Sequence, residues 1–534
     1  METPLTPLEF MRRTRKLYAD REGVVDGARR WTYGEFFDRC DRWSSALQRM
    51  GVRQGDRVAY IAPNIHAQLE SFYAIPQLGA VLVPINFRLV ADDFRYLIQH
   101  SGATVVCASS DYLDAVDSIR DDLRDVKQFV ALDGPSSAPG AMEGKRRAGW
   151  LDYEASIANA APDFMRPSIG ERDLLTINYT SGTTSRPKGV MITHRNAWMN
   201  CVGMLAHWPL TPADTYLWTL PMFHANGWTF TWAVTAAGGR HICLPRFDGA
   251  TVFEIAARER VTRLCAAPTV LIMMASAPAE VKAKAPKGVG VMTAGAPPAA
   301  VTIQRIEEEL GWNVIQIYGL TETAPAISIC EPRPEHASGD RDTRAKIKAR
   351  QGVELITSGE LRVVDDAGRD VPADGTTPGE IIARGNVVMA GYYNDPEATE
   401  RCMGDGWFHT GDAAVVHPDG YVQITDRLKD VIISGGENIS SVEVEAMLLR
   451  HDSVQEVAVV GFPNEKWGEA PHAFVVFKSG HTATADALRD FCRAHMAHFK
   501  VPHSFTPVPE LPKTATGKIQ KFVLRQGRPN IAAQ

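Results

Sequence analysis

The sequence predicts an α/β fold with a large N-terminal domain of parallel βα sheets, a small antiparallel β unit and a small α+β C-terminal domain. Three observations support this prediction. Apolar strand-like runs alternate with helical patterns from Trp31 to Tyr318, which is typical of parallel sheets covered on both faces. Short strands separated by turn signals follow from Gly359. The chain has 534 residues, too many for one compact core.

The N-terminal part begins with a helix over Trp31 to Met50, where Thr32 is the expected N-cap and Gly51 ends the helix. Strands and helices then alternate. The predicted strands are 57–62, 80–85 and 103–108, and the predicted helices are 66–78 and 92–100. Residues 133–149 are rich in Pro, Gly and Ser, and they predict an exposed loop.

The alternation resumes with a buried strand over Leu174 to Ile177 and a predicted helix over Val190 to Leu205. The later predicted strands are 215–220, 240–244, 263–267, 289–293 and 314–318, and the later helices are 228–237 and 251–260. Short strands at 360–364, 380–383 and 421–424 predict the antiparallel unit. About a hundred residues remain past Asp430, enough for a small separate domain.

Composition excludes several classes of protein. The net charge of −6 argues against a general nucleic-acid or anionic-membrane binder, since both need a basic surface. The eight cysteines are scattered and form no Cys-x-x-Cys pair, so neither a zinc site nor a disulfide framework is indicated. The chain shows no signal peptide, no bilayer-length apolar run and no peroxisomal ending. A cytoplasmic location is the expectation.

The loop over residues 178–189 carries the first chemical signal. Small hydroxyl residues and glycine after a buried strand suit an anion, because backbone N–H groups can turn inward and hydroxyls add donors. Lys188 adds a point charge for phosphate. The P-loop of nucleoside triphosphatases is excluded, because Pro187-Lys188-Gly189 replaces Gly-Lys-Ser/Thr. The candidate phosphate-binding residues are Thr180, Ser181, Gly182, Thr183, Thr184 and Lys188.

Four further motifs follow this loop in order. They are Tyr318-Gly319-Leu320-Thr321-Glu322, Trp407-Phe408-His409-Thr410-Gly411-Asp412, Asp426-Arg427-Leu428-Lys429-Asp430 with Ser434-Gly435-Gly436-Glu437-Asn438-Ile439, and Leu511-Pro512-Lys513-Thr514-Ala515-Thr516-Gly517-Lys518. Together with the loop, this set resembles the adenylate-forming superfamily of acyl-CoA synthetases, adenylation domains and beetle luciferases. Within it, the chain is most similar to the short- and medium-chain fatty acid–CoA ligases.

The resemblance implies a two-step reaction that uses ATP, Mg²⁺ and coenzyme A. A carboxylate attacks the α-phosphate of MgATP and gives acyl-AMP and pyrophosphate. The thiol of coenzyme A then displaces AMP and gives a thioester. Because two anions must meet in the first step, cationic donors and the metal must offset their repulsion.

The resemblance assigns roles around the nucleotide. Glu322 is the expected Mg²⁺ ligand, since a hard cation prefers oxygen, and Thr321 offers a hydroxyl to the α-phosphate. Tyr318, followed by Gly319, presents a flat face to adenine. The segment Gly295-Ala296-Pro297 is expected to approach the adenine closely, because glycine leaves room.

Three charged residues complete the implied site. Asp412 is expected to accept hydrogen bonds from the ribose hydroxyls. Arg427 is a bidentate donor for ribose or phosphate. Lys518 is expected to bridge the carboxylate and the α-phosphate, where a long ammonium stabilises charge that develops in the transition state.

The resemblance also implies two domains, 1–428 and 429–534, with a hinge at Lys429 and a mobile C-terminal domain. A rotation would withdraw Lys518 and bring Gly435 and Gly436 to the channel for coenzyme A. Glycines suit a narrow channel because they carry no side chain.

The acyl pocket is expected behind Pro221-Met222-Phe223-His224. His224 either orients the carboxylate or gates access to the nucleotide. Trp228 and Trp232 are one helical turn apart and are expected to share a face. If that face lines the pocket, the indoles favour a short to medium or compact acid; if it faces the sheet, they belong to the core.

Two alternatives stay open at the level of sequence. One is an adenylating enzyme that loads a carrier protein or an amine, and the other is a non-catalytic nucleotide-binding regulator. Intact Glu322, Asp412, Arg427 and Lys518 count against the regulator. The partners expected are a small carboxylic acid, ATP and coenzyme A, with no nucleic acid and no integral membrane segment. The choice between a monomer and a homodimer is open.

Overall fold

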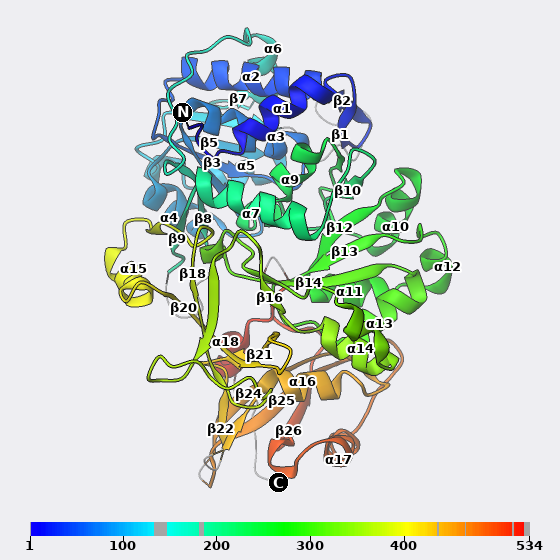
Figure 1. Ribbon diagram of the computed structural model, residues 1–534. Coiled ribbons are helices and arrows are strands. Elements are labelled where there is room, and N and C mark those ends of the chain that lie inside the picture. Colours follow the sequence, from blue (N-terminus) through cyan, green and yellow to red (C-terminus); the bar gives the residue numbers. More distant parts are fainter. Residues whose placement is uncertain are drawn as a thin grey trace.

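The computed structural model describes residues 2–132, 147–180, 186–434, 437–464, 466–514 and 517–527, and four sheets organise them (Figure 1). Two large, mainly parallel sheets form the N-terminal part. The predicted α/β class is therefore confirmed.

The first large sheet has nine strands in the described chain, and its six central strands are parallel. In spatial order the strands are β16 (Val353–Glu354), β15 (Ser328–Ile329), β14 (Asn313–Tyr318), β13 (Gly290–Thr293), β12 (Arg263–Ala266), β10 (Thr215–Leu217), β11 (Arg240–Ile242), β1 (Glu22–Asp26) and β2 (Arg29–Thr32).

The second large sheet has eight described strands, and two antiparallel strands form one of its edges. In spatial order they are β19 (Gly391–Tyr392), β9 (Gly189–Thr193), β8 (Leu174–Tyr179), β4 (Val81–Ile85), β3 (Arg57–Ile61), β5 (Ala103–Ser109), β6 (Gln128–Leu132) and β7 (Leu151–Asp152).

Both large sheets share one core. Val58 and Tyr60 of β3 belong to this shared core, whereas Ala59 and Ile61 belong to a separate core on the outer face of the sheet. This alternation follows from the two-residue period of a strand, and it explains the continuous apolar runs in the sequence.

The N-terminal helices are α1 (Leu8–Tyr18), α2 (Tyr33–Arg49), α3 (His66–Ala74), α4 (Ala91–Ser101), α5 (Leu113–Asp117), α6 (Tyr153–Ala158), α7 (His194–His207), α9 (Phe230–Ala237), α10 (Gly249–Arg258), α11 (Pro268–Ala275), α12 (Ala279–Lys282), α13 (Ala300–Arg305) and α14 (Arg341–Lys348).

The predicted start of the second helix is confirmed in detail. Thr32 accepts a hydrogen bond from the backbone N–H of Glu35, and the Glu35 carboxylate accepts one from the backbone N–H of Thr32. This capping box satisfies two N–H groups that a helix start leaves without partners.

Two predicted helices are wrong in part. Residues 190–193 form β9, antiparallel to β8, and α7 begins only at His194. The apolar run Val190-Met191-Ile192 was compatible with either structure, and pairing with β8 decided for the strand. The phosphate loop therefore joins two antiparallel strands rather than a strand and a helix.

The second error concerns the helix predicted over 228–237. The structure places Ala225–Trp228 in a left-handed turn, labelled α8, and Thr229 is also left-handed at φ +68°. The right-handed helix α9 begins at Phe230. Trp228 and Trp232 therefore do not share the face of one helix, and that argument for a short pocket is wrong.

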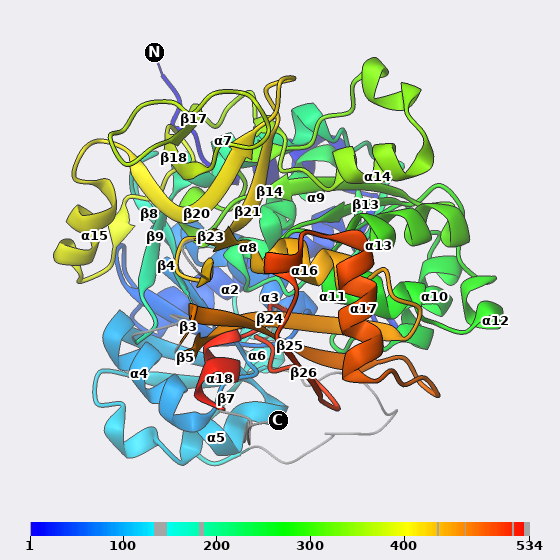
Figure 2. The same ribbon diagram turned by 90° about the horizontal axis from the view of Figure 1, so that it is seen from below.

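The antiparallel unit is a four-stranded sheet of β17 (Glu360–Val364), β18 (Gly379–Arg384), β20 (Phe408–Val416) and β21 (Val422–Arg427), with α15 (Pro396–Met403) beside it. The last sheet contains β23 (Glu437–Ile439), β22 (Ile432–Ser434), β25 (Gly468–Phe477), β24 (Val454–Asn464) and β26 (Ser504–Pro507), with helices α16 (Ser441–Leu448), α17 (Ala485–His495) and α18 (Lys521–Gln526). Seen from below, these C-terminal elements lie in front of both N-terminal sheets (Figure 2).

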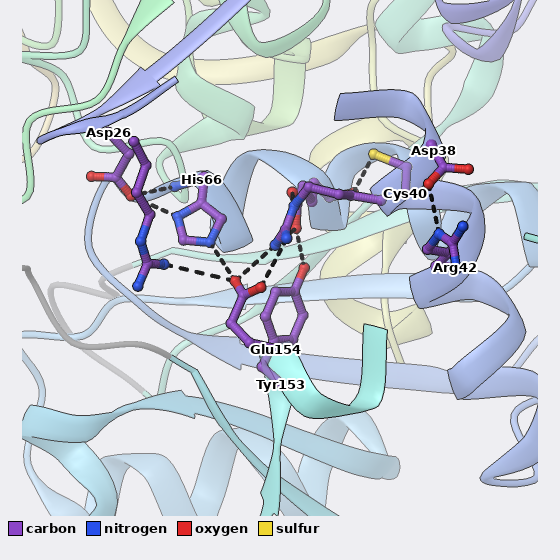
Figure 3. Close-up of polar contacts among 10 residues, drawn as sticks. Asp26, Asp38, Cys40, Arg42, His66, Tyr153 and Glu154 are labelled. Atoms are coloured by element: carbon purple, nitrogen blue, oxygen red, sulfur yellow. Dashed lines mark hydrogen bonds and ion pairs between the residues drawn. The ribbon is translucent and has the colours of Figure 1, made fainter. Parts of the chain in front are cut away.

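A buried charge network joins β1, α2, α3 and α6 (Figure 3). Arg39 binds Glu70 at 2.5 Å and Glu154 at 2.8 Å. His66 contacts Asp26 through Nδ1 at 2.7 Å and Glu154 through Nε2 at 2.9 Å. The network joins four elements, and because each of these charges has an opposite partner, their attraction offsets the desolvation cost of burying them.

Candidate active site

Three predicted residues come together: Tyr318 at the end of β14, Asp412 in the middle of β20 and Arg427 at the end of β21. Tyr318 donates its hydroxyl hydrogen to Asp412 at 2.7 Å, and the Nε of Arg427 lies 2.6 Å from the other Asp412 oxygen. Asp412 and Arg427 are paired across β20 and β21, so the sheet register fixes their distance. Burial and the nearby Asp412 charge raise the pKa of Tyr318, so its hydroxyl stays a donor.

Lys518 comes to this cluster from the C-terminal part of the chain. Its backbone N–H donates to Thr514 Oγ1 at 3.1 Å, and its carbonyl accepts from the Thr514 N–H at 2.7 Å, which closes a tight turn. Gly517 has φ +84° and lies so close to Thr269 of α11 that a Cβ at this position would overlap the threonine hydroxyl. The turn is therefore docked on the N-terminal domain.

Burial and the charge of Arg427 lower the pKa of Lys518 to about 8, although Asp412 acts in the opposite direction. Lys429 adds a further positive charge nearby. Lys518, Arg427 and Lys429 thus lie in electrostatic reach of one another and of two carboxylates, those of Asp412 and Asp430, so the cations outnumber the carboxylates. Such a site attracts an anion.

His224 lies within electrostatic reach of Lys518. Burial lowers the pKa of His224 to about 4, and the Lys518 charge adds to this effect. The imidazole is therefore neutral at physiological pH. A neutral ring can donate or accept a hydrogen bond without adding charge.

Thr321 and Glu322 lie on a 3-10 turn directly after β14. The Tyr392 hydroxyl donates to Glu322 Oε1 at 2.8 Å, and the Lys188 ammonium lies 4.7 Å from the centre of the Tyr392 ring. Tyr392 therefore brings the predicted metal ligand and the lysine of the phosphate loop to one place. Sequence reasoning missed Tyr392, although it pairs with Val190 immediately after that loop.

The phosphate loop begins with Thr180, whose backbone N–H donates to the carbonyl of Lys188 at 3.0 Å. The candidates Ser181, Gly182, Thr183 and Thr184 lie outside the described residues, as do Gly435 and Gly436 of the expected coenzyme A channel.

The two glycines near the expected adenine site are explained differently. Gly295, followed by Ala296 and Pro297 after β13, has φ +92° and faces open space. Gly319 is packed against the carbonyl oxygen of Pro325, with which a Cβ would overlap. Packing against its own chain is thus enough to require glycine at position 319.

The two tryptophans of the expected acyl pocket are both buried. Trp232 packs edge-to-face on Phe72 with ring centres 5.8 Å apart, and its indole N–H lies 3.4 Å from the Phe72 carbonyl. This is the environment of a core residue. Trp228 is the last residue of α8, the left-handed segment that follows His224 in the sequence.

A hollow of about 270 Å³ opens at the carboxyl ends of β3, β4, β5 and β11. Arg88 and Arg246 line it together with aromatic rings, and Arg246 pairs with Asp111 at 2.9 Å. Sequence reasoning missed both arginines. The available signal was their place just after two predicted parallel strands, where ligands bind in α/β folds.

Three further findings complete the description. Among the described residues, no three His, Cys, Asp or Glu side chains gather in a way that could hold a metal ion by themselves. The eight cysteines are free. No helix in the described ranges is long and apolar enough to cross a membrane.

Two family models match the chain: AMP-binding enzyme over residues 11–393 and AMP-binding enzyme C-terminal domain over residues 443–518. The chain is 41% identical to 4-hydroxybutyrate–CoA ligase 2 of Metallosphaera sedula, over 98% of this chain and 94% of that protein. It is 42% identical to acetate–CoA ligase CCL3 of Humulus lupulus with the same two coverages. ATP-bound MatB from Rhodopseudomonas palustris has the same fold, with a TM-score of 0.84, 28% identity and 98% coverage of both chains.

Proposed function

The chain belongs to the AMP-binding enzyme family and is an AMP-forming acid–CoA ligase, and from this premise we propose that it activates short carboxylic acids through an acyl-adenylate. The observation that carries the proposal is the position of Lys518. Its turn is docked on α11, and its ammonium lies in the electrostatic reach of Asp412, Arg427 and His224. This arrangement suits the first step, in which a carboxylate must approach a phosphate.

In that step, Lys518 binds the incoming carboxylate and the α-phosphate and stabilises the charge that develops between them. Thr321 donates its hydroxyl to the same phosphate. Asp412 holds the ribose hydroxyls, while Arg427 orients Asp412 through the ion pair at 2.6 Å. Neutral His224 orients the acid through a hydrogen bond, and Lys518 supplies the positive charge.

Glu322 fits a magnesium ion. Its carboxylate is held through Oε1 by Tyr392, and Mg²⁺ needs only one or two protein carboxylates when phosphates supply further ligands. When bound, Mg²⁺ offsets part of the triphosphate charge. Glu322→Gln should raise the Mg²⁺ concentration needed for half-maximal pyrophosphate exchange, and the metal requirement of ATP binding measured by calorimetry should rise with it. An unchanged requirement in both assays would reject Glu322 as the ligand.

For the second step, we propose a hinge at Lys429 between domains 1–428 and 429–534. β21 ends at Arg427 and β22 begins at Ile432, so few residues connect the two domains. Lys429→Pro should spare adenylation and block thioester formation, because proline fixes φ and removes the N–H. Equal losses in both half-reactions would reject the hinge.

The hollow beside Arg88 and Arg246 is the proposed site for the nucleotide end of coenzyme A. Two guanidiniums suit its phosphates, and the rings of Phe87, Tyr112 and Phe247 suit its adenine. Arg88→Glu should raise the KM for coenzyme A and leave pyrophosphate exchange unchanged. Slower pyrophosphate exchange with an unchanged KM for coenzyme A would instead assign the hollow to adenylation.

The proposed acids are short. Relatives at 41–42% identity are named for 4-hydroxybutyrate, acetate, acetate/butyrate and 2-methylpropanoate. Buried Trp228, close in sequence to His224, is the proposed end of the pocket. Trp228→Ala should shift the preference toward longer acids, and an unchanged chain-length profile would remove Trp228 from the pocket.

The central experiment is pyrophosphate exchange with acetate, butyrate, 2-methylpropanoate, 4-hydroxybutyrate, octanoate and benzoate, followed by mass spectrometry with coenzyme A. Exchange and thioester formation should both be strongest with the short acids. Strong activity only with octanoate or benzoate would reject the substrate class. A cytoplasmic location remains a prediction that fractionation can test, and light scattering can decide between a monomer and a homodimer.

A further inference from the structure

The segment that carries His224 is held in an unusual backbone conformation. Five consecutive residues, 225–229, have φ between +34° and +68°, and only one of them is glycine. L-residues avoid this region because Cβ approaches the backbone carbonyl oxygen, and such strain persists only where the surroundings impose it. The structure must therefore contain groups that impose this conformation.

One such group is Asn64, which follows β3 and is buried. Its amide donates to the carbonyls of Trp218 and Leu220 at 2.8 and 2.9 Å, and its oxygen accepts from the N–H of Met222 at 2.8 Å. One side chain thus binds three backbone groups in the segment before His224.

The other group is a closed ring of three buried side chains on β8 and α8. Thr176 donates to Asn178 at 2.7 Å, Asn178 to Asn226 at 3.2 Å, and Asn226 back to Thr176 at 2.9 Å. Asn178 also donates to the carbonyl of Phe223 at 3.2 Å, directly before His224. Hydrogen bonds in a closed buried ring strengthen one another, and asparagine is one of the few residues that tolerate a left-handed backbone.

These contacts connect the two halves of the site. Thr176 and Asn178 lie on the strand that leads into the phosphate loop, whereas Asn226 lies on the turn that follows His224. We infer that Asn64, Asn178 and Asn226 are positioning residues that fix His224 relative to the phosphate loop and thereby align the acid with the α-phosphate. This inference rests on the role of His224 in the proposed function.

A double-mutant cycle tests the inference in the pyrophosphate-exchange half-reaction. Asn64→Ala and Asn178→Ala should each lower kcat by roughly 10- to 100-fold, since small misplacements near the reacting atoms are costly. The KM for ATP should change little. In a His224→Ala background, the same substitutions should lower kcat by less than about twofold, because their effect acts through His224.

Asn196→Ala is the matched control. Asn196 is a buried asparagine that also donates to two carbonyls, those of Asn386 at 2.7 Å and Val388 at 3.0 Å, away from the His224 segment. In the double variant, the fold-reductions in kcat caused by Asn196→Ala and by His224→Ala should multiply. Asn226→Gly is the second test, because glycine permits the left-handed backbone and removes only the side chain; it should reproduce the loss seen with Asn178→Ala.

The outcomes are distinct. If His224→Ala slows exchange and the Asn64 and Asn178 effects multiply with it, the positioning role is wrong while the proposed function stands. If His224→Ala leaves exchange unchanged, the role of His224 in the proposed function fails, and the inference fails with it. Wild-type exchange activity in the Asn226→Gly variant would also overturn the inference. Thermal denaturation of each variant shows whether a loss of activity comes from misfolding.

Discussion

Two buried clusters of charged residues shift the pKa of a basic group in opposite directions. In the N-terminal network, burial alone would lower the pKa of His66, but hydrogen bonds to Asp26 and Glu154 raise it to about 9 (Figure 3). In the candidate active site, burial and Arg427 lower the pKa of Lys518 to about 8. Both groups are removed from water, so the sign of the neighbouring charges decides the outcome.

The comparison distinguishes charge that stabilises the fold from charge that serves the reaction. The network has partners for its charges and gains nothing from an added anion. The site holds the cations Lys518, Arg427 and Lys429 with the carboxylates of Asp412 and Asp430, so positive charge is in excess and an anionic substrate relieves an existing repulsion. Binding energy can then be used at the reacting atoms.

Breaking the network should have the largest effect, and it should be on stability. Arg39→Met leaves the fully buried Glu70 without its guanidinium and should cost about 3–5 kcal/mol of unfolding free energy, measured by urea denaturation. The activity of the folded fraction should stay near that of the wild type. Arg12→Met, which removes an exposed pair with Glu9, is the control and should leave the urea midpoint almost unchanged.

Removing Lys518 from the candidate active site should have the next largest effect, which should be on the rate of adenylation. Lys518→Ala should lower pyrophosphate exchange by about 10²- to 10³-fold, the usual cost of losing one preorganised donor to a transition state. The thermal midpoint should not fall, because a poorly compensated buried charge is removed. Lys188→Ala should lower exchange less, since we expect Lys188 of the phosphate loop to bind the phosphates that leave as pyrophosphate; the reverse order would contradict the central role of Lys518.

The pH dependence of stability should reveal the raised pKa of His66. The stabilisation by protonated His66 is complete below pH 6.5 and is lost as the pH rises through 9. The stability difference between the wild type and His66→Gln should therefore shrink by on the order of 1–2 kcal/mol between pH 7 and pH 9. A constant difference over this range would show that His66 is neutral in the network.

The smallest effect concerns the lowered pKa of Lys518. Deprotonation removes the cation, so kcat/KM for adenylation should fall about tenfold between pH 7 and pH 9. Lys518→Arg should lack this alkaline decline, even if it is slower, because arginine stays charged. Persistence of the decline in the arginine variant would assign it to another group.

Much of the fold could be predicted from local patterns. Thr32 predicted the start of α2, and the apolar runs of β3, β4 and β5 predicted parallel strands covered on both faces. The errors fell where a short apolar run suits two structures, as at Val190, or where the backbone is left-handed, as at Asn226. Neither outcome follows from propensity, since contacts distant in sequence impose both.

The motifs by themselves determined the family, the reaction class and the identity of the charged groups, because each motif carries the donors and acceptors that its chemistry needs. Tertiary structure alone decided which of them meet. It paired Asp412 with Arg427 through strand register, brought Tyr318 of another sheet to Asp412, placed Lys518 in their electrostatic reach, and brought Tyr392 to Glu322. The pKa values followed from that placement, because burial and neighbouring charge depend on distance in space and not on distance along the chain.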